Sequence, residues 1–301
     1  MRCGPFPGSD APSGKGAVPE PLRGPTMKNR LAVPVLFTLL LPGLLWAAPE
    51  ADLWERWQAH DPDSRLSVDH GPWTAFLEKY LVRGADGINR VDYRGVTPRD
   101  RARLDAYLET LAATEADRLS RASQLPFWIN LYNALTVQVI LDHLPVDSIR
   151  EIDISPGLFS NGPWGKKLVR VEGEEVSLND VEHRILRPIW QDPRIHYAVN
   201  CAALGCPNLQ PRAFTPENTE TLLEKGAGDY VNHPRGARVR DGDLEVSSIY
   251  DWYQADFGGS EAGVIDHLLR YAGPGLRQRL RGFREIDDYR YDWSLNQAGG
   301  E

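Results

Sequence analysis

The chain has 301 residues, of which 42% are hydrophobic, and a formal net charge of −8 at pH 7 with a pI near 5.5. This length holds one large domain or two small ones, and nine Trp with eleven Tyr supply apolar surface for a packed core. The acidic balance argues against general binding to nucleic-acid backbones, which needs clustered Lys and Arg.

The N-terminal segment is typical of an export signal that begins inside the sequence. Residues 1–26 are rich in Gly, Pro and Ser, which favours disorder, and we interpret them as an untranslated upstream extension. From Met27, a basic start, an apolar run and small residues predict a signal peptide over residues 27–48. The apolar run is short and contains two prolines, so we expect no stable membrane span after cleavage and a periplasmic or secreted protein. An uncleaved anchor is the alternative.

The next part of the chain carries helix patterns and one strand pattern. Residues 49–72 predict an N-terminal helix, at 52–59, followed by a linker. Aromatic and apolar side chains recur at helical spacing over residues 73–82 and 98–111, which predicts two packed helices. Alternating apolar and polar residues over 88–93 indicate a short strand.

The longest apolar segment, residues 123–143, predicts a buried central helix with Ser123 as its N-cap. Asn130 and Asn133 are out of character in it and lie on one face, three residues apart. Because buried amides need hydrogen-bond partners, these side chains either pin neighbouring loops or line a pocket. The sequence leaves both interpretations open.

The second half of the chain mixes short helices and strands. We predict hairpins at 167–176 and 238–246, a helix from Ser177 to Arg187 that ends at Pro188, a buried strand at 194–199, helices at 216–231, 248–257, 262–271 and 276–280, and a last strand at 284–287. Because no regular βαβ repeat is present, the predicted fold class is α+β. We expect one domain over residues 73–296, with its core at 120–235, a helical C-terminal part and a tail at 297–301.

Cys201 and Cys206 are the two cysteines of the expected mature chain. In an exported protein an even pair of cysteines usually forms a disulfide, and four intervening residues allow the loop to close. Alternatively, Cys201 is a nucleophilic thiol at the head of a helix. There, backbone N–H groups would lower the thiol pKa and hold an oxyanion.

A thiol nucleophile also needs a histidine base and a group that orients this base. His183 and His196 are the candidates. On an extended strand, five steps would place His196 far from Cys201, so we prefer His183. Asn130, Asn133 and Glu182 are the candidate orienting groups. Glu182 can equally form a structural ion pair with Arg187.

A metal site is a third interpretation, because His183, His196, Cys201 and Cys206 are common zinc ligands. Their spacing fits no zinc-finger or zinc-ribbon pattern, so we predict no metal. The sequence also contains no CxxC motif, P-loop, dinucleotide glycine motif or GxSxG motif, so we predict no cofactor.

Six motifs occur together in order. They are FWINLYNA at 127–134, WGKK at 164–167, VEHRILR at 181–187, DPRIHYAVNCA at 192–202, GCP at 205–207 and YDWSLN at 291–296. With them the chain resembles the uncharacterised domain-of-unknown-function family numbered 547, from about Trp73 to Asn296. The resemblance implies a single domain and a bacterial envelope protein, and it implies no established activity.

Two functions therefore stay open, and the sequence does not decide whether the protein is an enzyme. The working hypothesis is a thiol-dependent hydrolase or acyl-transfer enzyme that acts on a small-molecule or peptide-like substrate, with Cys201, His183 and Asn130 as its catalytic residues. The alternative is a non-catalytic envelope binding or scaffold protein with a Cys201–Cys206 disulfide. Pocket or structural polar roles then fall to Asn133, Glu182, Arg187, His196 and Cys206.

Overall fold

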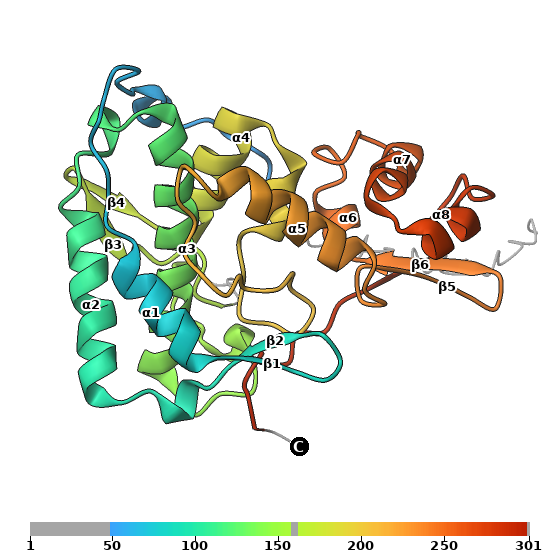
Figure 1. Cartoon of the computed structure of the whole chain (residues 1–301), viewed down its shortest axis with the longest axis horizontal. Coiled ribbons are helices and arrows are strands. Elements are labelled where there is room, and N and C mark those ends of the chain that lie inside the picture. Colours follow the sequence, from blue (N-terminus) through green and yellow to red (C-terminus); the bar gives the residue numbers. More distant parts are fainter. Residues whose placement is uncertain (1–48, 158–161, 300–301) are drawn as a thin grey trace, which may run out of the picture. The chain divides into compact units, whose positions relative to one another are not determined.

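The computed structural model describes residues 49–157 and 162–299, and Figure 1 shows how their helices and strands are arranged. The predicted upstream extension and signal peptide, residues 1–48, lie outside this part. Within it the fold is α+β, as predicted, with helices beside small sheets of two or three strands. No helix in the described ranges is long and apolar enough to cross a membrane.

The centre of the larger core is α3 (Arg121–His143), the buried helix that the sequence predicted. Its middle is buried on all sides because the segment is apolar nearly all round. Helix α2 (Pro98–Ala112) packs against α3, and α1 (Gly71–Tyr80) packs against α2 (Figure 1). The expected N-cap was wrong: Ser120 caps α3, since its side chain accepts a hydrogen bond from the Ser123 N–H.

The cap of α3 can be tested by a pair of alanine substitutions. Ser120→Ala is expected to lower the free energy of unfolding by about 1 kcal/mol, because it leaves an N–H group at the helix start without its acceptor. Ser123→Ala retains the cap and is expected to cost less. Urea unfolding of both variants measures the difference, and equal losses would contradict the assignment of the cap to Ser120.

Three small sheets accompany the helices. β1 (Leu81–Arg83) pairs antiparallel with β2 (Asn89–Val91), and β3 (Val169–Val171) pairs antiparallel with β4 (Glu174–Val176). β5 (Ala237–Arg240) pairs antiparallel with β6 (Asp243–Ser247), and β7 (Asp288–Arg290) joins β6 in parallel. The last strand therefore lies later than the predicted 284–287, because its pairing begins only where the Asp287 N–H donates to the Leu244 carbonyl.

A second apolar cluster lies around the β5–β6 hairpin. It is built by α5 (Thr219–Val231), α6 (Ile249–Trp252), α7 (Glu261–Tyr271) and α8 (Pro274–Leu280), and α8 packs against β5 (Figure 1). Single 3-10 turns connect many of the elements, at Glu55–Gln58, Tyr93–Gly95, Ala116–Arg118 and Ile149–Glu151. The helix predicted at 52–59 is thus a single 3-10 turn.

Two segments before the cysteines differ from the prediction. Residues 194–199, predicted as a strand, belong to a 3-10 helix, Pro193–Tyr197, whose start Asp192 caps by accepting the Arg194 N–H. A short apolar run does not distinguish a buried strand from a buried helical turn, and here Asp192 and the proline decide the outcome. The helix before it is a π-helix, Asp180–Leu186, and it continues as α4 (Arg187–Trp190), so Pro188 does not end it.

Candidate functional site

The π-helix Asp180–Leu186 points charged side chains into the protein. The backbone N–H of Arg187 donates to the Glu182 carbonyl, five residues earlier, which is the π spacing. Glu182, His183 and Arg187 are each at most 6% exposed. π-Turns are rare and occur frequently at functional sites. This segment is therefore the first place to look for chemistry.

Around this helix, five side chains form what we call the buried ion cluster: Glu182, His183, Arg187, His196 and Asp256. The His196 ring lies between two carboxylates, with Nε2 at 2.7 Å from Asp256 Oδ2 and Nδ1 at 3.6 Å from Glu182 Oε1. Arg187 donates from Nε to the same Asp256 oxygen at 2.6 Å and from Nη1 to His183 Nδ1 at 3.1 Å. The five side chains thus form one connected network.

Tyr253 packs against the cluster with its ring. This ring is stacked on that of His196 at a centroid distance of 4.2 Å, and the Arg187 guanidinium lies 4.8 Å from the Tyr253 centroid. Burial raises the pKa of the Tyr253 and Tyr132 phenols well above the usual value, and the Glu182 carboxylate adds to this rise. Both phenols are therefore protonated at neutral pH and can act only as hydrogen-bond partners or proton donors.

The charges of the cluster follow from burial and from its neighbours. Burial lowers the pKa of His183 to about 4, so this ring is neutral at pH 7. Burial alone would raise the pKa of Glu182, but His183, His196 and Arg187 outweigh it and bring the pKa down to about 2. Because His183 Nδ1 accepts from Arg187, the proton of the neutral ring is on Nε2.

Two buried histidines predict a loss of stability in mild acid. Burial lowers the pKa of His70 and of His183 from 6.5 to about 4 in the fold. The unfolded chain then binds more protons than the folded chain between these values, so stability falls as the pH falls from 6.5 towards 4. We expect each histidine to contribute roughly 2–3 kcal/mol to this loss at pH 4.5.

Urea unfolding at pH 7.5 and pH 4.5 measures this loss. His70→Asn is expected to remove part of the pH dependence, whereas His60→Asn, at an exposed position, leaves it unchanged. An unfolding free energy that stays constant between the two pH values would contradict the neutral state of the two buried rings.

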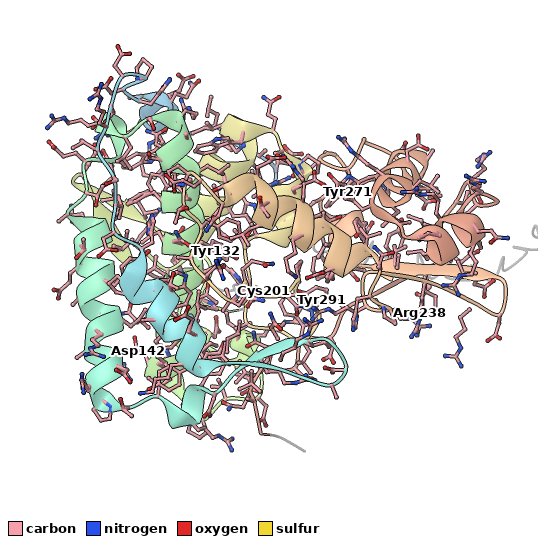
Figure 2. All side chains as sticks on the ribbon, viewed as in Figure 1. Tyr132, Asp142, Cys201, Arg238, Tyr271 and Tyr291 are labelled. Atoms are coloured by element: carbon pink, nitrogen blue, oxygen red, sulfur yellow. A yellow bond between two sulfur atoms is a disulfide. The ribbon has the colours of Figure 1, made fainter. Side chains whose placement is uncertain are left out.

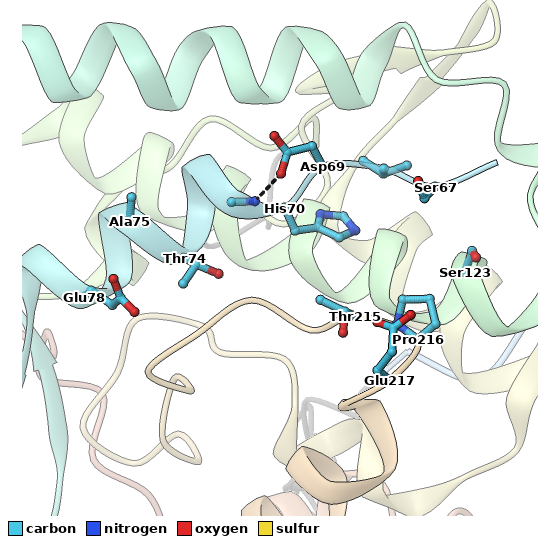
Figure 3. Close-up of a pocket in the computed structure, with 12 residues that line it drawn as sticks. Ser67, Asp69, His70, Thr74, Ala75, Glu78, Ser123, Thr215, Pro216 and Glu217 are labelled. Atoms are coloured by element: carbon cyan, nitrogen blue, oxygen red, sulfur yellow. Dashed lines mark hydrogen bonds between the residues drawn. The ribbon is translucent and has the colours of Figure 1, made fainter. Parts of the chain in front are cut away.

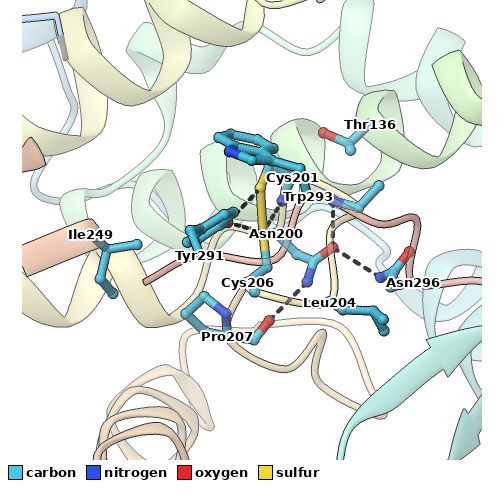
Figure 4. The surroundings of a disulfide bond; sticks show 12 residues. Thr136, Asn200, Cys201, Leu204, Cys206, Pro207, Ile249, Tyr291, Trp293 and Asn296 are labelled. Carbon is cyan, nitrogen blue, oxygen red and sulfur yellow. Dashed lines mark hydrogen bonds between the residues drawn. A yellow bond between two sulfur atoms is a disulfide. The ribbon is translucent and has the colours of Figure 1, made fainter. Parts of the chain in front are cut away.

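The predicted cysteines form a disulfide, Cys201–Cys206, with a Cα–Cα distance of 6.3 Å. The Tyr291 hydroxyl lies 3.0 Å from Cys201 Sγ and 3.1 Å from Cys206 Sγ, and the Cys201 N–H donates to Cys206 Sγ at 3.0 Å (Figure 4). Since disulfide sulfurs carry no proton, the Tyr291 phenol is the donor. Cys206 is buried and Cys201 is partly exposed, so Cys201 is the sulfur that a reagent can reach.

Many noncovalent contacts hold the loop that contains these cysteines. The Asn133 amide bonds to the backbone on both sides of Val199: its Oδ1 accepts from Asn200 N–H, and its Nδ2 donates to the Ala198 carbonyl. Further hydrogen bonds come from segments distant in sequence. The C-terminal segment contributes three backbone bonds: Leu204 N–H donates to the Ser294 carbonyl, Gly205 N–H to the Asp292 carbonyl and Asn296 N–H to the Ala202 carbonyl. Two side chains donate to backbone carbonyls of the loop, Tyr230 Oη to that of Gly205 and Arg235 Nη1 to that of Leu204. Ala202 adopts a left-handed φ of 59° inside this framework. Such strain persists only where the surroundings determine the backbone.

The structure places the predicted residues in two groups. Glu182, His183, Arg187 and His196 join in the buried ion cluster, whereas Asn133 and Cys206 belong to the cysteine loop. Asn130 bonds through both atoms of its amide to the backbone of Phe214. Within the described residues, no hydrogen bond joins Cys201 to His183, His196 or Asn130. The strand argument against His196 no longer applies, because that segment is helical.

Four residues of this region were missed. For Tyr253 and Asp256 the sequence offered only a weak signal: a tyrosine and an acidic residue stand three positions apart within an aromatic stretch. Tyr291 and Tyr132 occur in motifs that the sequence singled out, YDWSLN and FWINLYNA, without a role for either tyrosine. Figure 2 marks where Tyr132, Cys201 and Tyr291 lie in the fold. No sequence pattern indicated that Tyr291 contacts both sulfurs.

The described residues form two sizeable cavities near these elements. One, of about 430 Å³, is lined by His70, Asp69, Ser123 and Glu217 at the start of α1 (Figure 3). The other, of about 560 Å³, is lined by Leu204, Gly205 and Tyr291 beside the cysteine loop, together with several arginines. The second cavity therefore shares a wall with the disulfide region. In the described part of the chain, no group of three or more His, Cys, Asp or Glu is arranged to hold a metal ion.

Comparison with known proteins agrees with the motifs. Residues 116–231 match the family described as "Protein of unknown function, DUF547", which confirms the resemblance found in the sequence. The matched segment contains α3, the π-helix and the cysteine loop, but not Asp256 or Tyr291. No curated protein and no solved structure matches the chain.

Proposed function

Because the DUF547 family that residues 116–231 match is described as having no known function, we propose from the site itself that this chain is a thiol-dependent hydrolase or acyl-transfer enzyme with Cys201 as the nucleophile. The active form in this proposal is the reduced protein, in which the Cys201–Cys206 bond is open. We also propose that the protein works outside the cytoplasm, as the predicted signal peptide indicates.

The observation that carries this proposal is that the cysteine loop keeps its shape through many contacts besides the disulfide. A disulfide that closes six residues is expected to stabilise a protein by about 2 kcal/mol. Backbone and side-chain bonds from Asn133, Tyr230, Asn296 and the 292–294 segment already fix this loop. The loop geometry therefore does not rest on the disulfide alone, which supports a chemical role for the partly exposed Cys201.

Tyr291 supports such a role because it donates to the sulfur. Burial raises the pKa of its phenol well above the usual value, and the nearby Tyr253 and Glu182 raise it further. The phenol is thus always protonated and stabilises a thiolate on Cys201 by hydrogen bonding. In this geometry His183 does not serve as the base, because its Nδ1 lone pair is engaged by Arg187. The thiol proton leaves to solvent instead.

The reaction then has two stages. A dithiol reductant gives two hydrogens to the disulfide, so that Cys201 and Cys206 become thiols and the reductant closes its own disulfide. The Cys201 thiolate adds to the carbonyl carbon of an acyl substrate, and the leaving group departs with a proton from solvent, which leaves a thioester. Water, or a second nucleophile in acyl transfer, breaks the thioester and restores the thiol.

A thiol count tests the proposal. Mature protein is alkylated with iodoacetamide before and after mild reduction at a series of pH values. The intact mass counts the labels, and a peptide mass map assigns each label to Cys201 or Cys206. We expect no label before reduction, and after it faster labelling of Cys201 than of Cys206, with a midpoint below the usual thiol pKa near 8.5. Equal labelling of both reduced thiols at the rate of a free cysteine would overturn the proposal.

The alternative function is a non-catalytic envelope binding or scaffold protein. The closed disulfide favours it specifically, because the sulfurs are paired in the structure. The two functions predict different behaviour of the reduced protein. A scaffold protein does not begin to hydrolyse activated esters or thioesters when reductant is added, whereas a thiol enzyme does. A panel of p-nitrophenyl esters, assayed with and without reductant, separates the two functions.

A further inference from the structure

The cavity beside the cysteine loop, which we call the arginine pocket, carries more positive than negative side chains. Four arginines line it, Arg90, Arg235, Arg238 and Arg290, against three carboxylates, Asp86, Glu245 and Asp292. Its volume of about 560 Å³ is in the range of sites that hold a small molecule. Tyr291 and the 204–205 segment form part of its wall, and Figure 2 labels Arg238 and Tyr291.

Three of these arginines have carboxylate partners. Arg90 pairs with Asp86, with Nη2 at 2.7 Å from Oδ2. Arg238 and Arg290 both contact Glu245, and Arg290 also pairs with Asp288, with Nε at 2.7 Å from Oδ2. The side chain of Asp292 is exposed, and its Oδ1 accepts the Ser294 N–H.

Arg235 is different, because no carboxylate in the described residues contacts it. Its Nη1 donates to the Leu204 carbonyl at 2.7 Å and its Nη2 donates to Asn208 Oδ1 at 2.6 Å, both neutral acceptors. Its Nε is buried and has no hydrogen-bond partner. Burial lowers the pKa of this guanidinium, which remains charged at neutral pH. Arg235 is half-buried at the wall of the pocket and faces no carboxylate of the described residues, so a bound anion would stabilise this site.

His233 cannot neutralise this charge. Its Nδ1 accepts the backbone N–H of Arg235 at 3.2 Å, so Nε2 carries the ring proton and donates to the Asp86 carbonyl at 2.9 Å. Both nitrogens of the neutral ring are thus engaged, and burial lowers the pKa of His233. The arginine pocket therefore offers N–H donors and the positive charge of Arg235, which neither His233 nor a carboxylate of the described residues balances.

From this imbalance we infer that the arginine pocket binds a small oxyanion, a carboxylate or phosphate group, with Arg235 as its principal cation. Guanidinium groups recognise both oxyanions through paired N–H donors. The inference does not depend on the chemistry of Cys201. If both proposals hold, the pocket receives the anionic part of an acyl substrate, since Tyr291 contacts the pocket and both sulfurs.

Isothermal titration of the oxidised protein tests the inference without any activity assay. Inorganic phosphate and malonate are titrated separately at constant ionic strength, and sodium chloride serves as the salt control. We expect saturable 1:1 binding of at least one of them, and the tighter of the two identifies the oxyanion class. Arg235→Gln is expected to weaken binding at least about tenfold, by the loss of a charge-assisted contact. Arg279→Gln, at an exposed position outside the pocket, leaves it unchanged.

Near-UV circular dichroism shows whether Arg235→Gln folds. If it does not fold, a second variant, Arg235→Lys, provides the test. Arg235→Lys keeps the charge but loses the paired donors, and it is expected to bind the anion more weakly than the native protein while remaining folded. The wild-type protein should gain thermal stability from the bound anion, and the lysine variant should gain less. Absence of saturable binding to the native protein, or equal weakening by Arg279→Gln, would overturn the inference.

Discussion

Serine in place of Cys201 is expected to abolish the acyl-transfer activity of the reduced protein, by about three orders of magnitude or more, because a hydroxyl lacks the nucleophilicity of a thiolate. Serine in place of Cys206 is expected to retain activity and to remove the need for reductant, since Cys201 is then never paired. The two substitutions differ in position by five residues and break the same disulfide, so each is the control for the other.

Their stabilities separate this result from a structural effect. Both variants lose the same cross-link, so the free energy of unfolding should fall by a similar amount in each, about 2 kcal/mol for a six-residue loop. Hydrolysis of activated esters, followed with and without dithiothreitol, gives the activity, and urea unfolding gives the stability. If the Cys206 variant is as inactive as the Cys201 variant while both remain folded, the thiol-enzyme proposal fails and the scaffold function is favoured.

Methionine in place of Arg187 is expected to have the largest effect on stability, about 3 kcal/mol, because it leaves the half-buried Asp256 carboxylate without its guanidinium partner. The Arg187 side chain is only 4% exposed and contacts Asp256 at 2.6 Å. Arg118→Met is the matched control: that arginine is 62% exposed and pairs with Glu115 at the surface. Exposed pairs of this kind contribute at most about 1 kcal/mol.

A double substitution shows whether the loss comes from the broken ion pair. Arg187→Met leaves the Asp256 carboxylate without its guanidinium partner, and Asp256→Asn removes the charge of that carboxylate. The double variant should therefore be more stable, by about 1–2 kcal/mol, than the sum of the two single losses predicts. Equilibrium urea unfolding of the four proteins completes the cycle. Strict additivity would mean that Arg187 and Asp256 act independently, which the 2.6 Å contact contradicts.

Local patterns predicted much of the fold. The buried helix α3, the helices α1 and α2 and the hairpins β3–β4 and β5–β6 follow from periodicity and from turn residues, which act over a few positions. The errors occurred where several local structures compete. The apolar run at 194–199 became a 3-10 helix through its Asp192 cap, and the π spacing of Asp180–Leu186 has no pattern that distinguishes it from an α-helix.

The candidate site was predicted only in part, for a related reason. The histidines, Glu182, Arg187 and both cysteines were recognised as unusual by residue type and by motif. Their partners come from far along the chain: Asp256 reaches His196 across 60 residues, and Tyr291 reaches Cys201 across 90. Such pairings depend on how elements pack, and no spacing in the sequence encodes them.

The sequence by itself thus determined the α+β class, the central buried helix, the resemblance to the family that residues 116–231 match, and the residues with chemical potential. Only the tertiary structure decided which of these residues meet: His183 with Arg187, His196 with two carboxylates, Tyr291 with both sulfurs, and Arg235 with no carboxylate of the described residues. Periodicity is a property of neighbouring residues, whereas burial and pairing are properties of the whole packed chain. That difference explains why residue types were predictable and their contacts were not.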